Sequence, residues 1–126
     1  MFAVKDWSNA LDPSFGLTPD ITFVIIKNGD EVNSRRNKMM AHKYFLAMAS
    51  PVFKEMLFGP NKNTDNIVHI RGTSMEAFTL MIHHIYQKYI DWLDKPVVLM
   101  MEMFDLAESY GLDKLMEELQ LCLKIN

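Results

Sequence analysis

Cysteine, long apolar runs and an excess of positive charge are all scarce in this chain of 126 residues. Its one cysteine, Cys122, cannot form an internal disulfide and suits a reducing compartment. Apolar runs such as residues 97–101 are far shorter than the roughly 20 residues that cross a bilayer, and the first residues do not resemble a signal peptide. We therefore expect a cytoplasmic or nuclear protein that does not bind membranes.

The charge balance argues against nucleic acid as a partner. The formal net charge is −3 and the isoelectric point is about 5.7, whereas a nucleic-acid-binding domain carries a basic patch or stripe. One local basic cluster, formed by Arg35, Arg36 and Lys38, lies in a polar stretch that we interpret as a solvated hairpin tip.

Groups suited to catalysis or metal binding are also scarce. His83 and His84 are neighbours on an expected helix, so their side chains diverge and chelate one metal ion poorly. Ser50 stands between alanine and proline rather than in the glycine-flanked turn of a serine nucleophile, and there is no glycine-rich phosphate loop. We expect no enzyme activity, no catalytic residue, no metal, no cofactor and no small-molecule substrate.

In contrast, several segments of the chain have apolar residues at helical spacing. The most informative of them extends to both sides of Ser50 and Pro51. Serine suits a helix N-cap and proline suits a first helical turn. One helix should therefore end near Ala49 and a second should run from Pro51 to about Phe58. Gly59 is expected to end the second helix in a left-handed cap.

Three short strands are expected around these helices. β-Branched and aromatic residues predict a buried strand over residues 21–26. An Asn-Gly turn signal at residues 28–29 predicts a hairpin, whose return strand we place near residues 36–40. Residues 67–70 predict the third strand.

The C-terminal half is predominantly helical. Thr73 and Glu76 have the spacing of a capping box, which predicts a helix start whose N–H groups are satisfied locally. The next helix is apolar apart from a stripe of Glu102, Asp105 and Glu108, which we interpret as a solvated edge rather than an acid–base site. So narrow a polar stripe predicts packing around most of that helix.

A turn at Gly111 joins this helix to a last amphipathic helix, so the two should form an antiparallel hairpin. Residues 1–19 hold another apolar segment, with Val4, Trp7 and Leu11 at helical spacing. Three short strands cannot cover this many helices. The sequence therefore predicts an α+β domain, in which a cluster of helices is flanked by a small three-stranded sheet.

Several of these segments resemble the signature of BTB/POZ domains. The matching strings, in order, are DITFV at 20–24, AHK at 41–43, LAMASPVF at 46–53, EAF at 76–78, IY at 85–86, LAESY at 106–110, and the pair Leu115 and Cys122. They span about residues 20–123 in the family's order. The chain is thus identified as a member of this family, with the BTB/POZ domain at residues 20–126 and an N-terminal dimerisation segment at residues 1–19.

The resemblance implies a homodimeric protein-interaction domain. In many members the N-terminal segment crosses to the partner subunit, which would account for the large apolar groups there. The family's paired charges map onto Asp20 and Lys43, which would depend on each other if they were buried. The dimer interface that the resemblance implies consists of Val4, Trp7, Leu11, Phe15, Leu17, Asp20, Lys43 and Tyr44.

The resemblance also implies a role as a substrate adaptor, in which the domain docks onto a cullin-3 type ubiquitin ligase through the cullin N-terminal domain. The implied docking residues are Phe58, Asn61, Asn63, Met75, Phe78, Thr79 and Leu80. This sequence departs from the family in three respects. Leu80 stands where cullin-binding members often have a glutamate, and the hairpin between Lys27 and Lys38 is longer than is typical. Met39 and Met40 replace a pattern that usually carries valine or phenylalanine.

Two functions therefore stay open. The chain is a ligase adaptor, or it is a homodimerising assembly module of a transcriptional regulator or scaffold that binds corepressor-like partners. A monomeric relative of the channel-tetramerisation and elongin-like branch is disfavoured by the AHK string and by the apolar N-terminal segment. The sequence contains no kelch, zinc-finger, MATH or channel module and does not name a substrate.

Overall fold

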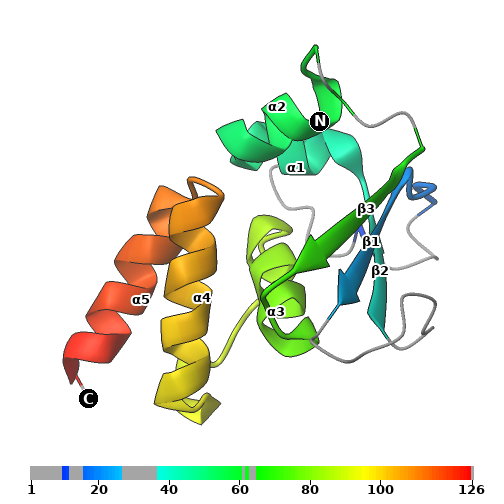
Figure 1. The fold of residues 1–126 in the computed structure, drawn as a ribbon. Helices are drawn as coiled ribbons and strands as arrows, with labels where there is room; N and C mark the ends of the chain where they lie inside the picture. The colour runs from blue at the N-terminus through cyan, green and yellow to red at the C-terminus, as the bar shows by residue number, and fades with distance from the viewer. Residues whose placement is uncertain (1–9, 12–15, 27–36, 61, 63–64, 126) are drawn as a thin grey trace.

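Helices stack beside a small sheet in the computed structural model, which describes residues 10–11, 16–26, 37–60, 62 and 65–125 (Figure 1). The elements, in chain order, are β1 (Ile21–Ile26), β2 (Lys38–Ala41), α1 (Lys43–Ala49), α2 (Pro51–Phe58), β3 (Ile67–Arg71), α3 (Met75–Ile85), the 3-10 helix η3 (Trp92–Asp94), α4 (Val97–Ser109) and α5 (Asp113–Ile125). This arrangement confirms the predicted α+β class, the three-stranded sheet and the C-terminal helical hairpin.

The sheet has the order β2-β1-β3, with β1 antiparallel to β2 and parallel to β3. Five of the six residues of β1 are buried, as expected for a central strand with a continuous apolar run. The return strand begins at Lys38 rather than near residue 36. The tip of the predicted hairpin, residues 27–36, lies outside the described residues.

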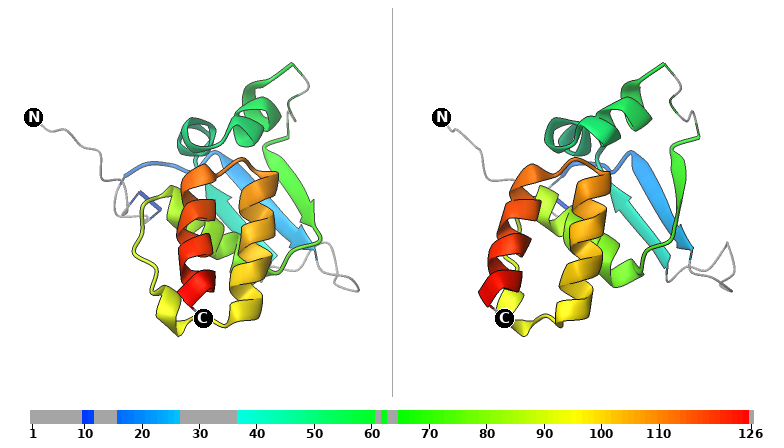
Figure 2. Two further views of the ribbon diagram at one scale, coloured as in Figure 1. Left: turned by 90° about the vertical axis from the view of Figure 1, so that its left-hand side faces the viewer. Right: turned by 60° about the vertical axis from the view of Figure 1, so that its left-hand side comes forward.

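The helices form successive layers on one side of the sheet. α3 packs between the sheet and α4, and α5 lies on the far side of α4 (Figure 1). α4 and α5 run antiparallel, while α1 and α2 close one end of the molecule (Figure 2). Among the described N-terminal residues, Ala10 is buried and Leu11 packs against the same core, so this part of the segment docks on its own domain.

Four aromatic rings join these layers. Phe23 of β1 lies 5.7 Å from Phe53 of α2 and 5.1 Å from Phe78 of α3, measured between ring centroids. Tyr110, at the end of α4, stacks on Phe53 at 4.5 Å. All four are buried, so the rings connect β1, α2, α3 and the end of α4 within one core.

The start of α2 is built as predicted and also holds the helical hairpin. The Ser50 hydroxyl accepts a hydrogen bond from the Phe53 N–H at 3.0 Å, and it donates to the carbonyl oxygen of Tyr110 at 2.5 Å. Gly111 has φ +67°, and a Cβ there would come within 3.1 Å of the Pro51 ring. The turn between α4 and α5 is therefore attached to the turn between α1 and α2.

Two predicted caps are wrong in detail. Gly59 ends α2 in an extended conformation, with φ −75° and ψ 178°, rather than in the left-handed region. A Cβ at Gly59 would meet the carbonyl oxygen of Glu55, so close approach rather than positive φ explains the glycine. α3 is capped by Ser74 rather than Thr73, and the Ser74 hydroxyl accepts from the Ala77 N–H.

Glu102 of α4 takes the place of the capping-box glutamate. Its carboxylate accepts hydrogen bonds from the Ser74 N–H at 2.6 Å, from Ser74 Oγ at 3.0 Å and from Thr73 Oγ1 at 3.0 Å. Glu76 remains exposed. The prediction of a fully solvated acidic stripe is therefore wrong for Glu102, which fixes the start of α3 against α4.

The prediction that α4 is packed around most of its circumference is also wrong for its first two turns. Val97, Val98 and Met101 are 44%, 77% and 56% exposed. The opposite side of the helix packs into the core through Leu99 and Met103.

Candidate protein-interaction surfaces

The start of α1 is held by a buried hydrogen-bond network. The Tyr86 hydroxyl accepts from the His42 backbone N–H at 2.7 Å and lies 2.7 Å from His42 Nδ1. The other ring nitrogen, Nε2, lies 3.3 Å from the carbonyl oxygen of Leu17. A carbonyl oxygen can only accept, so we assign the ring proton to Nε2, and Nδ1 of the neutral ring then accepts from the Tyr86 hydroxyl. The network ties the chain before β1 to α1 and α3.

A group of exposed apolar side chains surrounds this network. We call it the α1 face; its members are Leu17, Met40, Tyr44 and Met48, which are 43%, 55%, 67% and 54% exposed. They come from the segment before β1, the end of β2 and one side of α1. Large apolar groups exposed together on rigid elements are typical of a protein–protein interface.

The predicted dimer residues have mixed positions. Leu17 and Tyr44 belong to the α1 face, whereas Leu11 packs partly against the domain's own core. Val4, Trp7 and Phe15 lie outside the described residues.

Asp20 and Lys43 do not form the expected side-chain pair. The Asp20 carboxylate accepts from the backbone N–H of Lys43 at 2.8 Å, so it caps the first turn of α1. The Lys43 ammonium donates instead to Asn66 Oδ1 at 2.5 Å. Asp20 is exposed and Lys43 is half-buried, so the condition of burial, under which the two charges would depend on each other, is not met.

Phe78 was expected on the docking surface and is instead a core residue. Its side chain is 0% exposed, and its ring contacts Phe23 and Tyr110. It cannot contact a partner in the folded domain, so this site prediction is wrong. The apolar spacing of α3 predicts one buried side, but it does not say whether the domain or a partner covers that side.

The other predicted docking residues lie around the core rather than in it. Phe58, the last residue of α2, is 52% exposed. Met75, Thr79 and Leu80 are partly buried. Asn61 and Asn63 lie outside the described residues.

A groove of about 410 Å³ runs between α2, the end of β3 and α4. Val52 and Met56 line its apolar side, whereas Arg71 and Asp105 bring opposite charges to it. Such a mixture suits an amphipathic protein segment.

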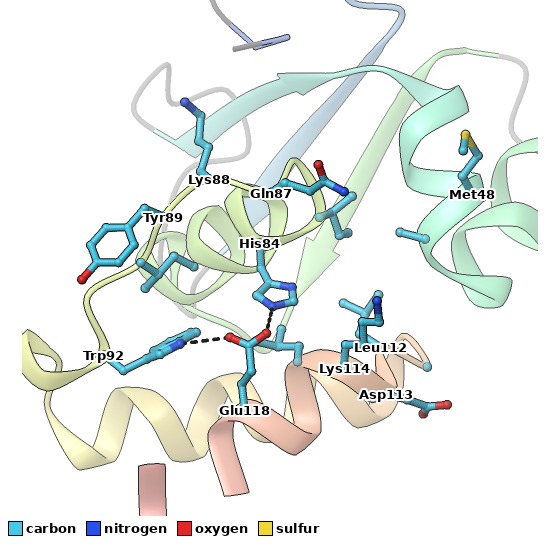
Figure 3. Close-up of a pocket in the computed structure, with 15 residues that line it drawn as sticks. Met48, His84, Gln87, Lys88, Tyr89, Trp92, Leu112, Asp113, Lys114 and Glu118 are labelled. Carbon is cyan, nitrogen blue, oxygen red and sulfur yellow. Dashed lines mark hydrogen bonds and ion pairs between the residues drawn. The ribbon is translucent and has the colours of Figure 1, made fainter. Parts of the chain in front are cut away.

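A larger pocket, of about 770 Å³, lies between the end of α3, the loop that follows it and the first turns of α5 (Figure 3). Glu118 of α5 projects into it, with Oε2 at 2.7 Å from His84 Nε2 and Oε1 accepting from Trp92 Nε1 at 3.3 Å. These contacts join α3, η3 and α5. Tyr89, which also lines this pocket, is 89% exposed.

The titratable groups show burial rather than catalytic pairing. Burial raises the pKa of Tyr86, against a smaller opposing effect of its hydrogen bond with His42. Burial also raises the pKa of Tyr110. Burial, followed by the positive charge of Lys88, lowers the pKa of His83.

The part of the chain that the structure describes contains neither a candidate metal site nor a candidate membrane span. No group of three or more histidine, cysteine, aspartate or glutamate side chains there is placed to hold a metal ion. None of the helices there has the length and apolar character to cross a membrane.

Sequence reasoning missed the distant partners of the helix starts. Glu102 caps α3, Asp20 caps α1, and Ser50 hydrogen-bonds to Tyr110. The two partners in each contact are far apart in the sequence, so a local sequence pattern does not predict the contact. The available signal for Glu102 was a carboxylate in the middle of a largely apolar helix.

A family model described as the BTB/POZ domain matches residues 16–124. The chain belongs to the BTB/POZ family. The helices and the three-stranded sheet described above are therefore the elements of a BTB/POZ domain. This fold generally serves protein–protein interaction and dimerisation rather than catalysis.

Relatives with this domain include BTB/POZ domain-containing protein 6 of Xenopus laevis, which is 31% identical over 66% of this chain. BTB/POZ domain-containing protein 9 of Homo sapiens is 26% identical over 76% of this chain. The matched regions cover 15% and 14% of those two proteins, so the chain spans a small part of the curated relatives that it matches.

The BTB domain of zebrafish PATZ1 has the same fold. The two structures superpose with a TM-score of 0.68 at 19% identity, covering 100% of this chain and 98% of that one.

Proposed function

We propose that this BTB/POZ domain homodimerises through the α1 face and serves as the docking part of a substrate adaptor for a cullin-3 type ubiquitin ligase, in the cytoplasm or the nucleus. The observation that carries the proposal is the α1 face itself, in which Leu17, Met40, Tyr44 and Met48 are all exposed around one helix start.

The α1 face is suited to a second copy because its backbone is already ordered. The His42–Tyr86 network fixes the chain on both sides of the face before any partner arrives. Association then costs less conformational entropy than it would for a loose segment. Exposed Tyr44 offers a large apolar area with a hydroxyl at its rim, a combination that is enriched at interface centres.

The groove between α2 and α4 supports the docking half of the proposal. It is open, and its mixed lining suits one helix of a scaffold protein. Phe58 is not part of the groove lining, but it is exposed at the end of α2, one of the elements that form the groove. We therefore assign Phe58 rather than Phe78 to partner docking.

One observation favours the second candidate, an assembly module that binds corepressor-like partners. Leu80 is partly buried and packs against the core, so this position offers neither a carboxylate nor a free side chain to a cullin. The docking test therefore has to separate dimerisation from cullin binding.

Light scattering on a sizing column, with increasing amounts of a cullin-3 N-terminal domain, tests both halves. We expect a dimer of twice 14.7 kDa that gains two cullin domains. Phe58→Ala should weaken the cullin complex at least about tenfold and leave the dimer intact, because the ring is exposed. Tyr44→Glu should yield monomers, and Leu121→Glu, a matched change on α5, should change neither mass.

The outcomes separate the two candidates. A dimer that takes up no cullin excludes the adaptor and leaves the assembly module. If the original chain and the Tyr44→Glu variant both have the mass of a monomer, dimerisation through the α1 face is excluded under both proposals.

A further inference from the structure

The outward side of α4 has two unlike halves. Val97, Val98 and Met101 share one side of the first two turns, and Asp105 and Glu108 continue that side over the last two turns. We call these five residues the α4 face. Its first half is apolar and exposed, and its second half is acidic and exposed.

The apolar half is not needed by the domain's own core. Leu99, Met100, Met103 and Ala107 supply the buried side of α4, so the exposed valines and Met101 add nothing to internal packing. Val98, at 77% exposure, is among the most open apolar side chains of the described residues. An apolar surface of this kind on a regular helix is typical of a surface that another protein covers.

Charge is concentrated around the same helix. Five carboxylates and one lysine lie between residues 91 and 108, so this stretch has a formal charge of −4, whereas the whole chain has −3. The lysine, Lys95, lies 3.8 Å from the Asp94 carboxylate, and Glu102 caps α3. Asp91, Asp105 and Glu108 are left exposed beside the apolar half.

We propose that the α4 face binds an amphipathic helix of a protein partner, with aliphatic side chains against Val97, Val98 and Met101 and lysine or arginine side chains against Asp105 and Glu108. The occupant follows from charge complementarity. A second copy of this chain docked through the same face, or an anionic lipid surface, would bring negative charge against negative charge. A basic segment is instead attracted and oriented by the acidic half.

This surface differs from those assigned above. Val97, Val98 and Met101 line neither the groove nor the larger pocket, and they do not belong to the α1 face. Asp105 alone is shared with the groove.

The test uses the whole chain and a fluorescent synthetic helical peptide of about 18 residues. The peptide carries leucines on one side of its first half and arginines on the same side of its second half. A comparison peptide has glutamates in place of the arginines. Binding is measured by anisotropy at two salt concentrations, and amide NMR shifts locate the peptide on the chain.

We expect the arginine peptide to bind, to shift the amides of α4 and to weaken as salt rises. Val98→Glu and the pair Asp105→Lys with Glu108→Lys should each weaken binding at least about tenfold, because each removes one half of the complementarity. Leu121→Glu, which adds the same charge at an exposed position of α5, should change binding by less than about twofold.

Three results would overturn the proposal. The arginine peptide binds Val98→Glu as well as the original chain, which would mean that it recognises charge alone. The glutamate peptide binds equally well, which would remove the argument from charge. Met101→Glu converts a dimer into monomers, which would make the occupant a second copy.

Discussion

Phe78 and Phe58 are both phenylalanines that the family resemblance placed on one partner surface, and the fold puts them in opposite environments. Phe78 is enclosed between Phe23 and Tyr110, whereas Phe58 is 52% exposed at the end of α2. The four-ring core and the α1 face show the same contrast on a larger scale. Aromatic side chains occur in both regions, so residue type does not distinguish a core residue from a surface residue; the neighbouring elements do.

Removing a ring from the core should have the largest effect on stability. Phe78→Ala should lower the free energy of unfolding by about 3–5 kcal/mol, because it opens a cavity inside the cluster. Phe58→Ala is the matched control and should lower it by less than about 1 kcal/mol. Urea unfolding measures both. Similar losses for the two variants would break the distinction between core and surface.

The second-largest loss of stability is expected at the cap that joins α3 and α4. Glu102→Ala removes the acceptor of three hydrogen bonds at the start of α3 and should cost about 2–3 kcal/mol. Asp105→Ala, one turn along the same helix, should be within about 0.5 kcal/mol of the original chain because Asp105 is exposed. If Asp105→Ala lowers the free energy of unfolding as much as Glu102→Ala does, the loss does not come from the hydrogen bonds of Glu102.

The Tyr86 hydroxyl should have a smaller effect that depends on pH. Tyr86→Phe leaves the buried His42 N–H without its acceptor and should cost about 1–2 kcal/mol at neutral pH. Because burial raises the pKa of Tyr86, the folded state holds the phenol proton more tightly than the unfolded chain does. This contribution is complete below the ordinary tyrosine pKa of about 10 and is lost as the pH rises through the higher pKa of the folded state.

Urea midpoints measured from neutral to alkaline pH test that sign. The original chain should lose stability above about pH 10, and Tyr86→Phe should remove part of the slope, leaving the share of Tyr110. Tyr89→Phe, at a tyrosine that is 89% exposed, should leave the profile unchanged.

The smallest effect on stability is expected on the α1 face. Tyr44→Ala should change the unfolding free energy of the monomer by less than about 0.5 kcal/mol, since the side chain is 67% exposed. It should nevertheless weaken self-association at least about tenfold in sedimentation equilibrium. A destabilised monomer with unchanged association would place Tyr44 with the core rather than with the interface.

Most of the fold could be predicted because its signals are local. The run of β1, the serine and proline at the start of α2, and the turn at Gly111 each lie within a few residues of what they determine. Gly59 was placed correctly for the wrong reason, because the obstacle is the carbonyl of Glu55 rather than a positive φ.

The surfaces were harder to predict because burial depends on distant neighbours. The periodicity of α3 marked Phe78 as apolar-facing, and the apolar content of α4 suggested packing around most of its circumference. Only the packing of the other elements around α4 shows that Met100 is buried and that Val98 is exposed. Likewise, no local pattern links Glu102 to Ser74, because their hydrogen bond joins two helices.

The contact of Ser50 with Tyr110 has a consequence for exchanging parts between members of this family. The helical hairpin is fastened to the α1–α2 corner by one hydroxyl, and the Pro51 ring fits against a glycine that has no side chain. A chimera that takes α4 and α5 from a relative must therefore keep the serine, the proline and Gly111 together. A chimera that lacks one of these residues could retain all the apolar residues of the core and would still pack the hairpin incorrectly against the α1–α2 corner.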